Sequence, residues 1–327
     1  MSERNIVNAT YRFQFTKNFR FADAEALVPY LDRLGISHIY ASPVFEARPG
    51  SLSGYDTCDF SRISPELGGE EALQSLVNAL HARGMGLVID FVPNHMSAHP
   101  QWNRWWRNVL ANGPSSSVSE YFDIDWYPVN SNLHGKVLLA ILGKQYGDAL
   151  DSGDLHIEYR DGEFCLICYD LNLPLNPRQM KFLFRHRWAA SADHARIEPS
   201  VRQEFESILF QLDHIPGYRQ AGTEARMERE RETQIAMGRL AKAIEQSPAL
   251  RRHLDGVVAE FNGQPGHPES FDLLHTLLEQ QPYRLAYWRT AMHEINYRRF
   301  FDINDLVGLR MENPRVFAHT HRLLRRL

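Results

Sequence analysis

The run from Gly86 to His95, Gly-Leu-Val-Ile-Asp-Phe-Val-Pro-Asn-His, constrains the fold of this chain more than any other segment. It begins with consecutive apolar residues, which is typical of a parallel strand that is buried on both faces. Val-Pro-Asn-His then turns out of the strand. The side chains of Asp90, Asn94 and His95 should therefore lie together at its carboxyl end, which is where β/α barrels place their chemistry.

Earlier residues repeat an alternation of strand and helix. Two predicted helices are each followed by a glycine, Gly35 or Gly84, as is typical where a helix ends. The predicted strands are residues 10–15, 38–45 and 86–90, and the predicted helices are residues 21–34 and 69–83. Three βα units in succession predict a parallel sheet with right-handed crossovers.

The pattern changes after His95. Residues 96–127 are aromatic and are predicted to be loop-like, and residues 134–170 are predicted to form a small β region with a turn at 160–163. Residues 177–290 are predicted to be helical, and a last helix is predicted from Val316 to Leu327. We expect three segments: residues 1–108 with the βα units, 109–290 as an insertion, and 291–327 returning to the first part.

Composition excludes several classes of protein. The 327 residues are 43% hydrophobic, which is ample for a globular core. The net charge of −4 gives no reason to expect nucleic acid or an anionic membrane as a partner. There is no apolar run of about 18 residues that could span a membrane. Residues Met1 to Asn5 lack an apolar signal core, so we expect a cytoplasmic protein.

The chain has 3 cysteines, and two of them, Cys165 and Cys168, form a Cys-x-x-Cys motif. A zinc site would need a second pair of ligands at a suitable spacing, and none is evident. We therefore interpret these cysteines as buried structural residues. The pairs Asp123 with Asp125 and Asp302 with Asp305 are weak calcium signals, and no metal is predicted.

A second polar segment, Leu52-Ser-Gly-Tyr-Asp-Thr57, follows the second predicted strand, so Tyr55 and Asp56 should lie at the same carboxyl edge. An aromatic ring packs on the apolar face of a pyranose, while a carboxylate and a neutral imidazole bind its hydroxyl groups. Taken alone, Gly-Tyr-Asp could be an ordinary turn, and Asp90 with His95 could be a network that holds loops. Together they favour a sugar site.

These segments resemble a known family. Asp90-Phe-Val-Pro-Asn-His95 resembles the first conserved region of the α-amylase superfamily of glycoside hydrolases, and Gly54-Tyr-Asp56 resembles the Gly-Tyr-Asp that precedes it. Five more segments resemble the maltooligosyl trehalose synthases within that superfamily: residues 9–15, 42–51, 65–70, 121–126 and 295–302. The last, Ile-Asn-Tyr-Arg-Arg-Phe-Phe-Asp, is the most specific. The resemblance implies an α/β fold, a partial (β/α)8 TIM barrel with a large, mostly helical insertion after the third strand.

The resemblance also implies a reaction. The reducing-end α-1,4 linkage of a maltooligosaccharide is converted to an α,α-1,1 linkage, and the partner in the pathway is maltooligosyltrehalose trehalohydrolase. A retaining mechanism of this kind uses two carboxyl groups about 5–5.5 Å apart, excludes water and needs no cofactor. Five aromatic residues are candidate walls for the released glucose: Trp102, Trp105, Trp106, Trp126 and Tyr127. At least half of them should instead serve the core.

Residue by residue, the resemblance implies that Tyr55 stacks on the sugar and that Asp56 supports the polar network around it. It implies that His95 binds the hydroxyl at C6 and that Asn94 braces the loop. Asp90 is expected to orient a barrel arginine rather than to touch substrate.

Three residues near the end of the chain belong to the family-specific motif. Arg298, Arg299 and Asp302 either shape the site for the glucose acceptor or form a salt-bridge network without substrate contact. The residues alone do not decide between these two roles.

The nucleophile of the superfamily follows the fourth strand in a pattern like Gly-Leu-Arg-Ile-Asp-His. Gly308-Leu-Arg-Met-Glu312 resembles this pattern, but Asn313-Pro314 follows at once and the run precedes the last predicted helix, so we reject the match. We expect no catalytic carboxylate within the chain, with the nucleophile and the general acid lying beyond Leu327.

The chain is then expected to be the N-terminal part of a longer enzyme. Because an unclosed sheet exposes its edge, the isolated chain should be inactive and prone to aggregation. Two alternatives stay open. An α-amylase-type hydrolase would create reducing ends, whereas the synthase would consume them, and a non-catalytic α-glucan-binding remnant would do neither.

Overall fold

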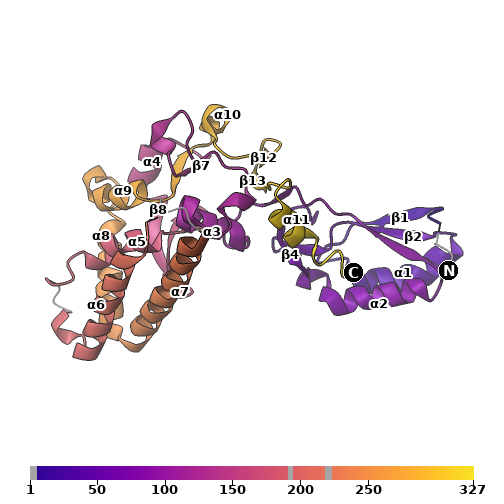
Figure 1. The fold of residues 1–327 in the computed structure, drawn as a ribbon, viewed down its shortest axis with the longest axis horizontal. Coiled ribbons are helices and arrows are strands. Elements are labelled where there is room, and N and C mark those ends of the chain that lie inside the picture. The colour runs from indigo at the N-terminus through magenta and orange to yellow at the C-terminus, as the bar shows by residue number, and fades with distance from the viewer. Residues whose placement is uncertain (1–5, 191–193, 218–222) are drawn as a thin grey trace. The chain divides into compact units, whose positions relative to one another are not determined.

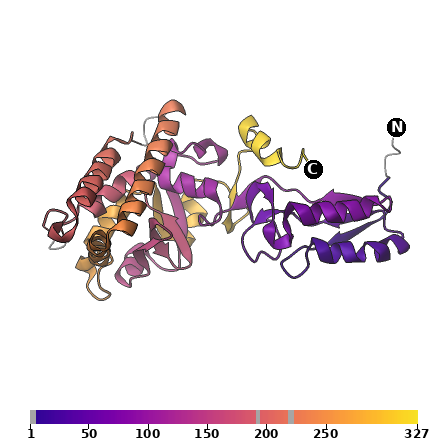
Figure 2. The same ribbon diagram turned by 90° about the horizontal axis from the view of Figure 1, so that it is seen from below.

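The computed structural model describes residues 6–190, 194–217 and 223–327, so the expectation about Met1 to Asn5 lies outside the described residues. The chain divides into two compact units (Figures 1 and 2). Unit 1 comprises Met1–Arg104 and Arg299–Leu327, and unit 2 comprises Trp105–Arg298. No helix in the described part of the chain is long and apolar enough to cross a membrane.

Unit 1 contains the predicted βα units. Strands β1 (Thr10–Phe13), β2 (His38–Ala41) and β5 (Gly86–Ile89) form a parallel sheet in the order β1-β2-β5. Helices α1 (Phe21–Arg33) and α2 (Gly69–His81) pack against each other. The prediction of an α/β fold with successive βα units and parallel strands is confirmed. The sheet is not closed into a barrel within the described residues.

The second strand is shorter than predicted. It ends at Ala41, and the chain from Phe45 to Ala47 forms a separate strand, β3, which pairs antiparallel with β4 (Thr57–Ile63). The prediction of one strand over residues 38–45 is therefore wrong. Pro43 explains the break, because proline has no N–H for the ladder and restricts the residue before it.

Strand β5 is also less buried than predicted. The exposed fraction of Val88 is 36%, and the other three residues of β5 are half-buried. The prediction of burial on both faces is wrong for two reasons. β5 is an edge strand of its sheet, and α1 and α2 both lie along the same side of that sheet (Figure 1).

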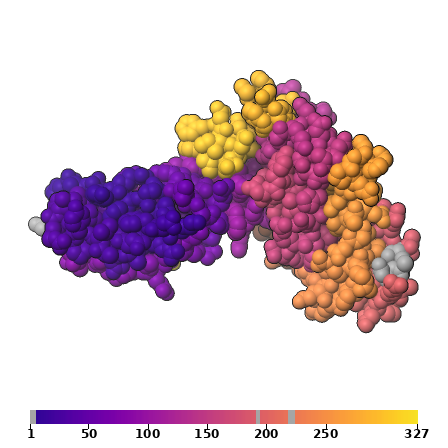
Figure 3. Space-filling view, turned by 180° about the vertical axis from the view of Figure 1, so that it is seen from behind, coloured from indigo at the N-terminus to yellow at the C-terminus, as the bar shows by residue number. Residues whose placement is uncertain are grey.

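The remainder of unit 1 is antiparallel. Strands β6 (His95–Ser97), β12 (Arg299–Phe300) and β13 (Ile303–Gly308) pair in the order β12-β13-β6. The last helix, α11, covers Pro314–His321 rather than residues 316–327 and packs against β4, as its yellow surface beside purple residues of the unit shows in Figure 3. Because β13 runs antiparallel to β6, Gly308-Leu-Arg-Met-Glu312 does not follow a parallel barrel strand. This supports rejecting it as the nucleophile segment.

Unit 2 combines two small sheets with helices. β7 (Val137–Leu142) pairs parallel with β11 (Tyr283–Tyr287), and three other strands form an antiparallel sheet. Those strands are β8 (Leu155–Arg160), β9 (Glu163–Cys168) and β10 (Leu171–Pro174). The helices are α3 (Arg104–Asn112), α4 (Tyr146–Asp151), α5 (Pro177–Arg185), α6 (Pro199–His214), α7 (Thr223–Gln246), α8 (Pro248–Phe261), α9 (Asp272–Glu279) and α10 (Ala291–Glu294).

Several predictions for this region are confirmed. Strand β7 covers all but one residue of the hydrophobic run from Lys136 to Leu142, and the turn between β8 and β9 has Asp161 at φ 53° and Gly162 at φ 85°. Two consecutive residues with positive φ are the geometry of a tight type I′ hairpin turn. Cys165 and Cys168 are buried free thiols on β9, as interpreted from the sequence.

Two predictions for this region are wrong. The stretch predicted to be loop-like contains α3, whose residues Trp106, Val109 and Leu110 are buried on one face at helical spacing. Residues 283–287, predicted to be helical, form β11. Trp106 packs against Phe122 in the core and is not a sugar wall in this structure, whereas Trp102 and Tyr127 are exposed.

Candidate functional site

A carboxylate at the end of β5 gathers side chains from all three parallel strands. The Asp90 Oδ2 atom accepts hydrogen bonds from the hydroxyl of Tyr40, at 3.1 Å, and from the hydroxyl of Tyr55. A guanidinium nitrogen of Arg12 lies 3.8 Å from the same oxygen and 3.3 Å from the Tyr55 hydroxyl. We call Arg12, Tyr40, Tyr55 and Asp90 the Asp90 cluster.

The cluster arises directly from the topology. Arg12 lies on β1, Tyr40 on β2, and Asp90 directly follows β5, so the parallel register brings the three side chains to one edge. The backbone N–H of Asp90 still donates to the carbonyl of Ala41 at 2.9 Å, which fixes the start of the turn. The Tyr55 hydroxyl reaches this edge from the loop between β3 and β4.

The phenol of Tyr55 is held in its protonated form. Its hydrogen bond to Asp90, followed by desolvation and the charge of Asp90, raises the pKa of Tyr55 above its usual value of 10. Because the neutral phenol is favoured in the folded protein, it can donate to Asp90 throughout the neutral range. Its contribution to stability is full below pH 10 and is lost as the pH rises through the raised value.

His95 is the buried member of this region, with an exposed fraction of 1%. Its Nε2 atom lies 2.9 Å from the backbone carbonyl oxygen of Tyr55, and its Nδ1 atom lies 2.7 Å from the side-chain amide of Asn94. The ring stacks on Phe300, with centroids 4.0 Å apart and planes inclined by 22°.

Burial lowers the pKa of His95 below 6.5, with the Tyr55 carbonyl and the charge of Asp56 acting in the opposite direction. The ring is therefore neutral near pH 7, and Nε2 carries the proton because a carbonyl oxygen can only accept. Nδ1 is then an acceptor, and the side-chain oxygen of Asn94 lies 2.7 Å from it, so Asn94 can donate to the ring only when the oxygen and nitrogen of its amide group exchange places. Both nitrogen atoms are occupied, so His95 holds the Tyr55 backbone in this structure.

Asp56 belongs to a separate network. One carboxylate oxygen accepts a hydrogen bond from the Ser51 hydroxyl, and the other lies 3.9 Å from Arg48. Arg48 also donates to Nε2 of His99 at 2.8 Å. Gly54 makes the turn before Tyr55 with φ 79°, and a Cβ atom there would lie 2.9 Å from the Pro43 carbonyl oxygen. Only glycine fits this close approach without strain.

The three residues of the motif that resembles the synthases divide between the units. Arg298, in unit 2, lies 3.5 Å from the carboxylate of Asp123. In unit 1, Arg299 donates to the side chain of Asn304 at 2.5 Å and lies 3.4 Å from Asp302. These contacts agree with the salt-bridge alternative, and a role for the three residues at the glucose acceptor stays a prediction.

Sequence reasoning placed Tyr55, Asp90, Asn94 and His95 in one region but missed three of their partners. It expected an arginine beside Asp90 without identifying Arg12, and it did not single out Tyr40 or Phe300. The available signal was the position of Arg12 and Tyr40 within predicted strands that should pair in register. The described residues contain no group of three or more His, Cys, Asp or Glu side chains that could hold a metal ion.

Known proteins with similar sequences and structures indicate which family this chain resembles. The family model of the alpha amylase catalytic domain matches residues 24–148. A putative maltooligosyl trehalose synthase of Mycobacterium tuberculosis is 43% identical over 170 residues, which cover 48% of this chain and 22% of that protein. The structure of maltooligosyltrehalose synthase from Arthrobacter ramosus is similar over 97% of this chain and 29% of its own, with 31% identity and a TM-score of 0.62. The chain is similar to maltooligosyl trehalose synthases over most of its length and spans less than a third of theirs.

The relationship to synthases extends further along the chain than that to amylases. The intracellular maltogenic amylase of Bacillus subtilis is 40% identical over 104 residues, or 32% of this chain and 17% of that protein. A hypothetical maltooligosyl trehalose synthase of Sulfolobus tokodaii is similar over 98% of this chain, with 25% identity and a TM-score of 0.59. This chain covers 30% of the Sulfolobus structure, less than a third of its length. The resemblance inferred from the motifs is confirmed.

The Asp90 cluster leads to a first prediction. In Asp90→Asn, the charge is lost while one acceptor oxygen remains, so the pKa of Tyr55 should fall toward 10. Weakening these hydrogen bonds should also reduce the free energy of unfolding by about 1–2 kcal/mol. The difference in tyrosinate absorbance between each protein and its Tyr55→Phe variant isolates the titration of Tyr55. The control Asp32→Asn, on α1, should leave that titration unchanged.

Proposed function

We propose that this chain carries the sugar-binding side of a (1→4)-α-D-glucan 1-α-D-glucosylmutase, which converts the reducing-end α-1,4 linkage of maltooligosaccharides to α,α-1,1. The observation that carries the proposal is the likeness to the Arthrobacter ramosus synthase over 97% of the chain, because it includes unit 2 as well as the βα units. The proposal includes a cytoplasmic location and a trehalohydrolase that consumes the product.

In this proposal, Tyr55 supplies the sugar platform. Its ring is partly exposed, and its hydroxyl is held by Asp90 and Arg12, so the ring is oriented before a sugar arrives. Such preorganisation reduces the entropy that binding must overcome. His95 positions the same residue through its hydrogen bond to the backbone carbonyl oxygen of Tyr55. The role of His95 is then to fix the platform, and a contact with the sugar C6 hydroxyl would require that hydrogen bond to open.

The proposed chemistry is a retaining double displacement. A carboxylate attacks the anomeric carbon while a carboxylic acid protonates the leaving oxygen, and the released glucose then attacks the glycosyl-enzyme through its own anomeric hydroxyl. Asp56 and Asp90 are engaged by Ser51, Arg48, Tyr40 and Tyr55, so we assign them to support. We propose that the nucleophile and the general acid are contributed by residues outside these 327. Residues 109–290 are proposed to be an insertion subdomain.

The second prediction tests the platform. Tyr55→Ala should weaken the binding of maltohexaose to the chain at least about tenfold, which corresponds to about 1.4 kcal/mol, because the stacking surface is removed. Titration calorimetry measures the change. Tyr30→Ala, which removes an exposed tyrosine from α1, is the matched control and should bind like the wild type. Equal affinity of Tyr55→Ala and Tyr30→Ala would contradict the assignment of Tyr55.

The reaction is tested on a protein that contains this chain together with the catalytic carboxyl groups that the proposal requires. Incubation with maltohexaose should lower the concentration of reducing ends, because the α,α-1,1 linkage consumes one in each conversion. A rise would instead support an α-amylase-type hydrolase, the alternative that the likeness to the Bacillus subtilis maltogenic amylase favours. Binding with no change in reducing ends would support a non-catalytic α-glucan-binding protein.

A further inference from the structure

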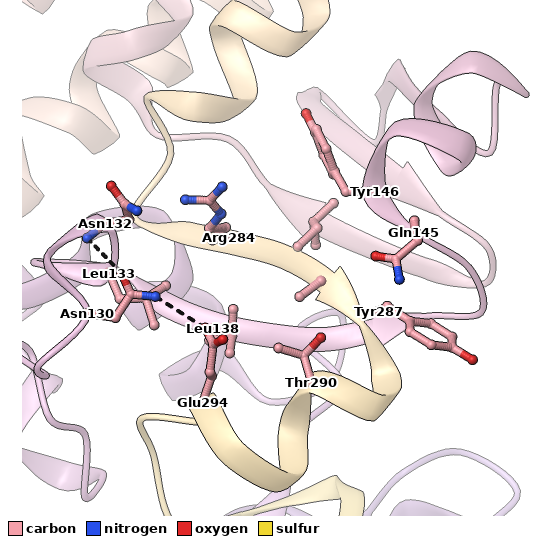
Figure 4. Close-up of a pocket in the computed structure, with 12 residues that line it drawn as sticks. Asn130, Asn132, Leu133, Leu138, Gln145, Tyr146, Arg284, Tyr287, Thr290 and Glu294 are labelled. Carbon is pink, nitrogen blue, oxygen red and sulfur yellow. Dashed lines mark hydrogen bonds between the residues drawn. The ribbon is translucent and has the colours of Figure 1, made fainter.

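Unit 2 contains a pocket of about 230 Å³ that none of the residues of the candidate functional site lines. It lies along the parallel pair β7 and β11, and Figure 4 shows the labelled side chains standing around these two strands. Its lining residues are Asn130, Asn132, Leu133, Leu138, Gln145, Tyr146, Arg284, Leu285, Ala286, Tyr287, Thr290 and Glu294. Asn130 and Asn132 flank a turn before β7, whereas Gln145 and Tyr146 follow that strand.

The polar groups of the pocket are largely uncommitted. Among the described residues, the side chains of Asn132, Gln145 and Arg284 make no hydrogen bond or ion pair, and Arg284 is half-buried. Glu294 accepts a hydrogen bond from the side-chain amide of Asn130 at 3.2 Å. Planar amide, guanidinium and carboxylate groups are therefore available in one small space.

Charge in the pocket is balanced, because Arg284 is its one guanidinium and Glu294 its one carboxylate among the lining residues. An anionic ligand would be attracted by Arg284 and repelled by Glu294. A neutral ligand with many hydroxyl groups can use both, since hydroxyls donate as well as accept. The lining thus favours a polyhydroxylated neutral molecule.

Two tyrosines add aromatic surface. Tyr146 is held by a hydrogen bond between its hydroxyl and Nδ1 of His275, at 3.1 Å, and Tyr287 lies at the end of β11. Tyrosine has an apolar ring and a polar hydroxyl group, which suits ligands that combine apolar faces with polar edges, as sugar rings do. The apolar floor comes from Leu133, Leu138 and Leu285.

A smaller cavity of about 50 Å³ shares three lining residues with this pocket, Tyr146, Arg284 and Leu285. Tyr283 also lines the smaller cavity. It is 1% exposed, and its hydroxyl has no hydrogen-bond partner among the described residues. A buried hydroxyl without a partner is uncommon and indicates that a water or a ligand group completes it.

From these contacts we propose that the pocket binds a sugar unit of a neutral oligosaccharide, with Arg284, Gln145 and Asn132 contacting hydroxyl groups and the tyrosines contacting the ring. Its volume is below the roughly 300–1,000 Å³ of pockets that enclose drug-sized ligands, so it accepts one unit of a longer chain. The identification of that chain as an α-1,4-glucan rests on the proposed function. The site gives unit 2 a binding role of its own.

The third prediction separates this pocket from the Tyr55 platform with maltohexaose as the probe. In the Tyr55→Ala background, calorimetry or saturation-transfer NMR should still detect binding to the full chain. Adding Arg284→Ala and Gln145→Ala to that background should weaken the remaining binding at least about tenfold. Because both side chains lack protein partners, the melting temperature should change little. Arg231→Ala on α7, whose side chain is 68% exposed, is the matched control.

The outcomes distinguish the two assignments. If Tyr55→Ala alone abolished binding, or if the remaining binding were unchanged by Arg284→Ala with Gln145→Ala, the pocket proposal would be overturned while the platform stood. If Tyr55→Ala had no effect and the pocket variants removed all binding, the platform would fail and the pocket would stand. Competition by inorganic phosphate that depends on Arg284 would overturn the assignment to a neutral ligand.

Discussion

His95→Ala should destabilise unit 1 by about 3 kcal/mol. The substitution leaves a cavity where a fully buried ring stacks on Phe300, and it leaves the Tyr55 carbonyl without its donor. A large-to-small change in a core costs about 2–5 kcal/mol, and an unsatisfied buried polar group adds about 1–3 kcal/mol, part of which water entering the cavity recovers. Urea unfolding followed by circular dichroism measures the loss as a lower midpoint.

Two further variants apportion the effect. His95→Phe keeps a ring on Phe300 but has no nitrogen, so it should recover the packing part of the loss and not the hydrogen bonds to Tyr55 and Asn94. His81→Ala removes an exposed histidine from α2 and should change stability by less than about 0.5 kcal/mol. A His95→Ala protein as stable as His81→Ala would show that the ring is not packed as described.

The same residue predicts a dependence on pH. Burial lowers the pKa of His95 in the folded protein, so below pH 6.5 the unfolded chain takes up a proton that the folded protein does not. The wild type should therefore be fully stabilised above pH 6.5 and should lose stability as the pH falls from 6.5 toward the lowered value. The difference in unfolding free energy between the wild type and His95→Phe, measured at several pH values, should shrink over this interval. A constant difference would contradict a buried neutral ring.

Much of unit 1 could be predicted from the sequence because its signals are local. Helical spacing identified α1 and α2, and glycine marked their ends near Gly35 and Gly84. The turn after β5 was predictable because Asp90 and the Pro-Asn-His segment directly follow an apolar run. The side chains of Tyr40 and Asp90 then meet for a topological reason, since β2 and β5 are parallel and in register, and Tyr55 joins them from the loop between β3 and β4.

What could not be predicted depends on contacts between distant segments. The packing of Phe300 on His95 joins residues that are far apart in the sequence, and no periodicity encodes it. The exposure of Val88 was missed because an apolar run has the same pattern in a central strand and in an edge strand. Helix α3 was missed because its buried residues are few and its aromatic content resembled a loop that lines a site.

Asn296→Ala is expected to have the largest effect on unit 2. The residue is 7% exposed and lies in the segment that most specifically resembles the synthases. Its side-chain oxygen accepts from the backbone N–H of Leu138 at 2.9 Å, and its amide nitrogen donates to the carbonyls of Asp125 and Lys136, each at 2.8 Å. One side chain thus fixes the start of β7 and the loop before it.

Removing these three hydrogen bonds leaves one buried donor and two acceptors without partners. At about 1–3 kcal/mol for each unsatisfied group, with part recovered by water, unit 2 should lose about 4 kcal/mol of stability. Hydrogen exchange at the amide of Leu138 should accelerate strongly, because that N–H loses its acceptor. Thermal unfolding followed by calorimetry measures the overall loss.

Asn296→Asp separates the effects of the lost acceptor and the lost donor. It keeps the acceptor for Leu138 but directs a carboxylate oxygen at the carbonyls of Asp125 and Lys136. It should therefore protect the Leu138 amide and still destabilise the unit, since two acceptors face each other. Asn132→Ala, at an exposed position in the same unit, should change stability by less than about 0.5 kcal/mol. If Asn296→Ala unfolded at the same temperature as Asn132→Ala, the three hydrogen bonds of Asn296 would not stabilise unit 2 as described.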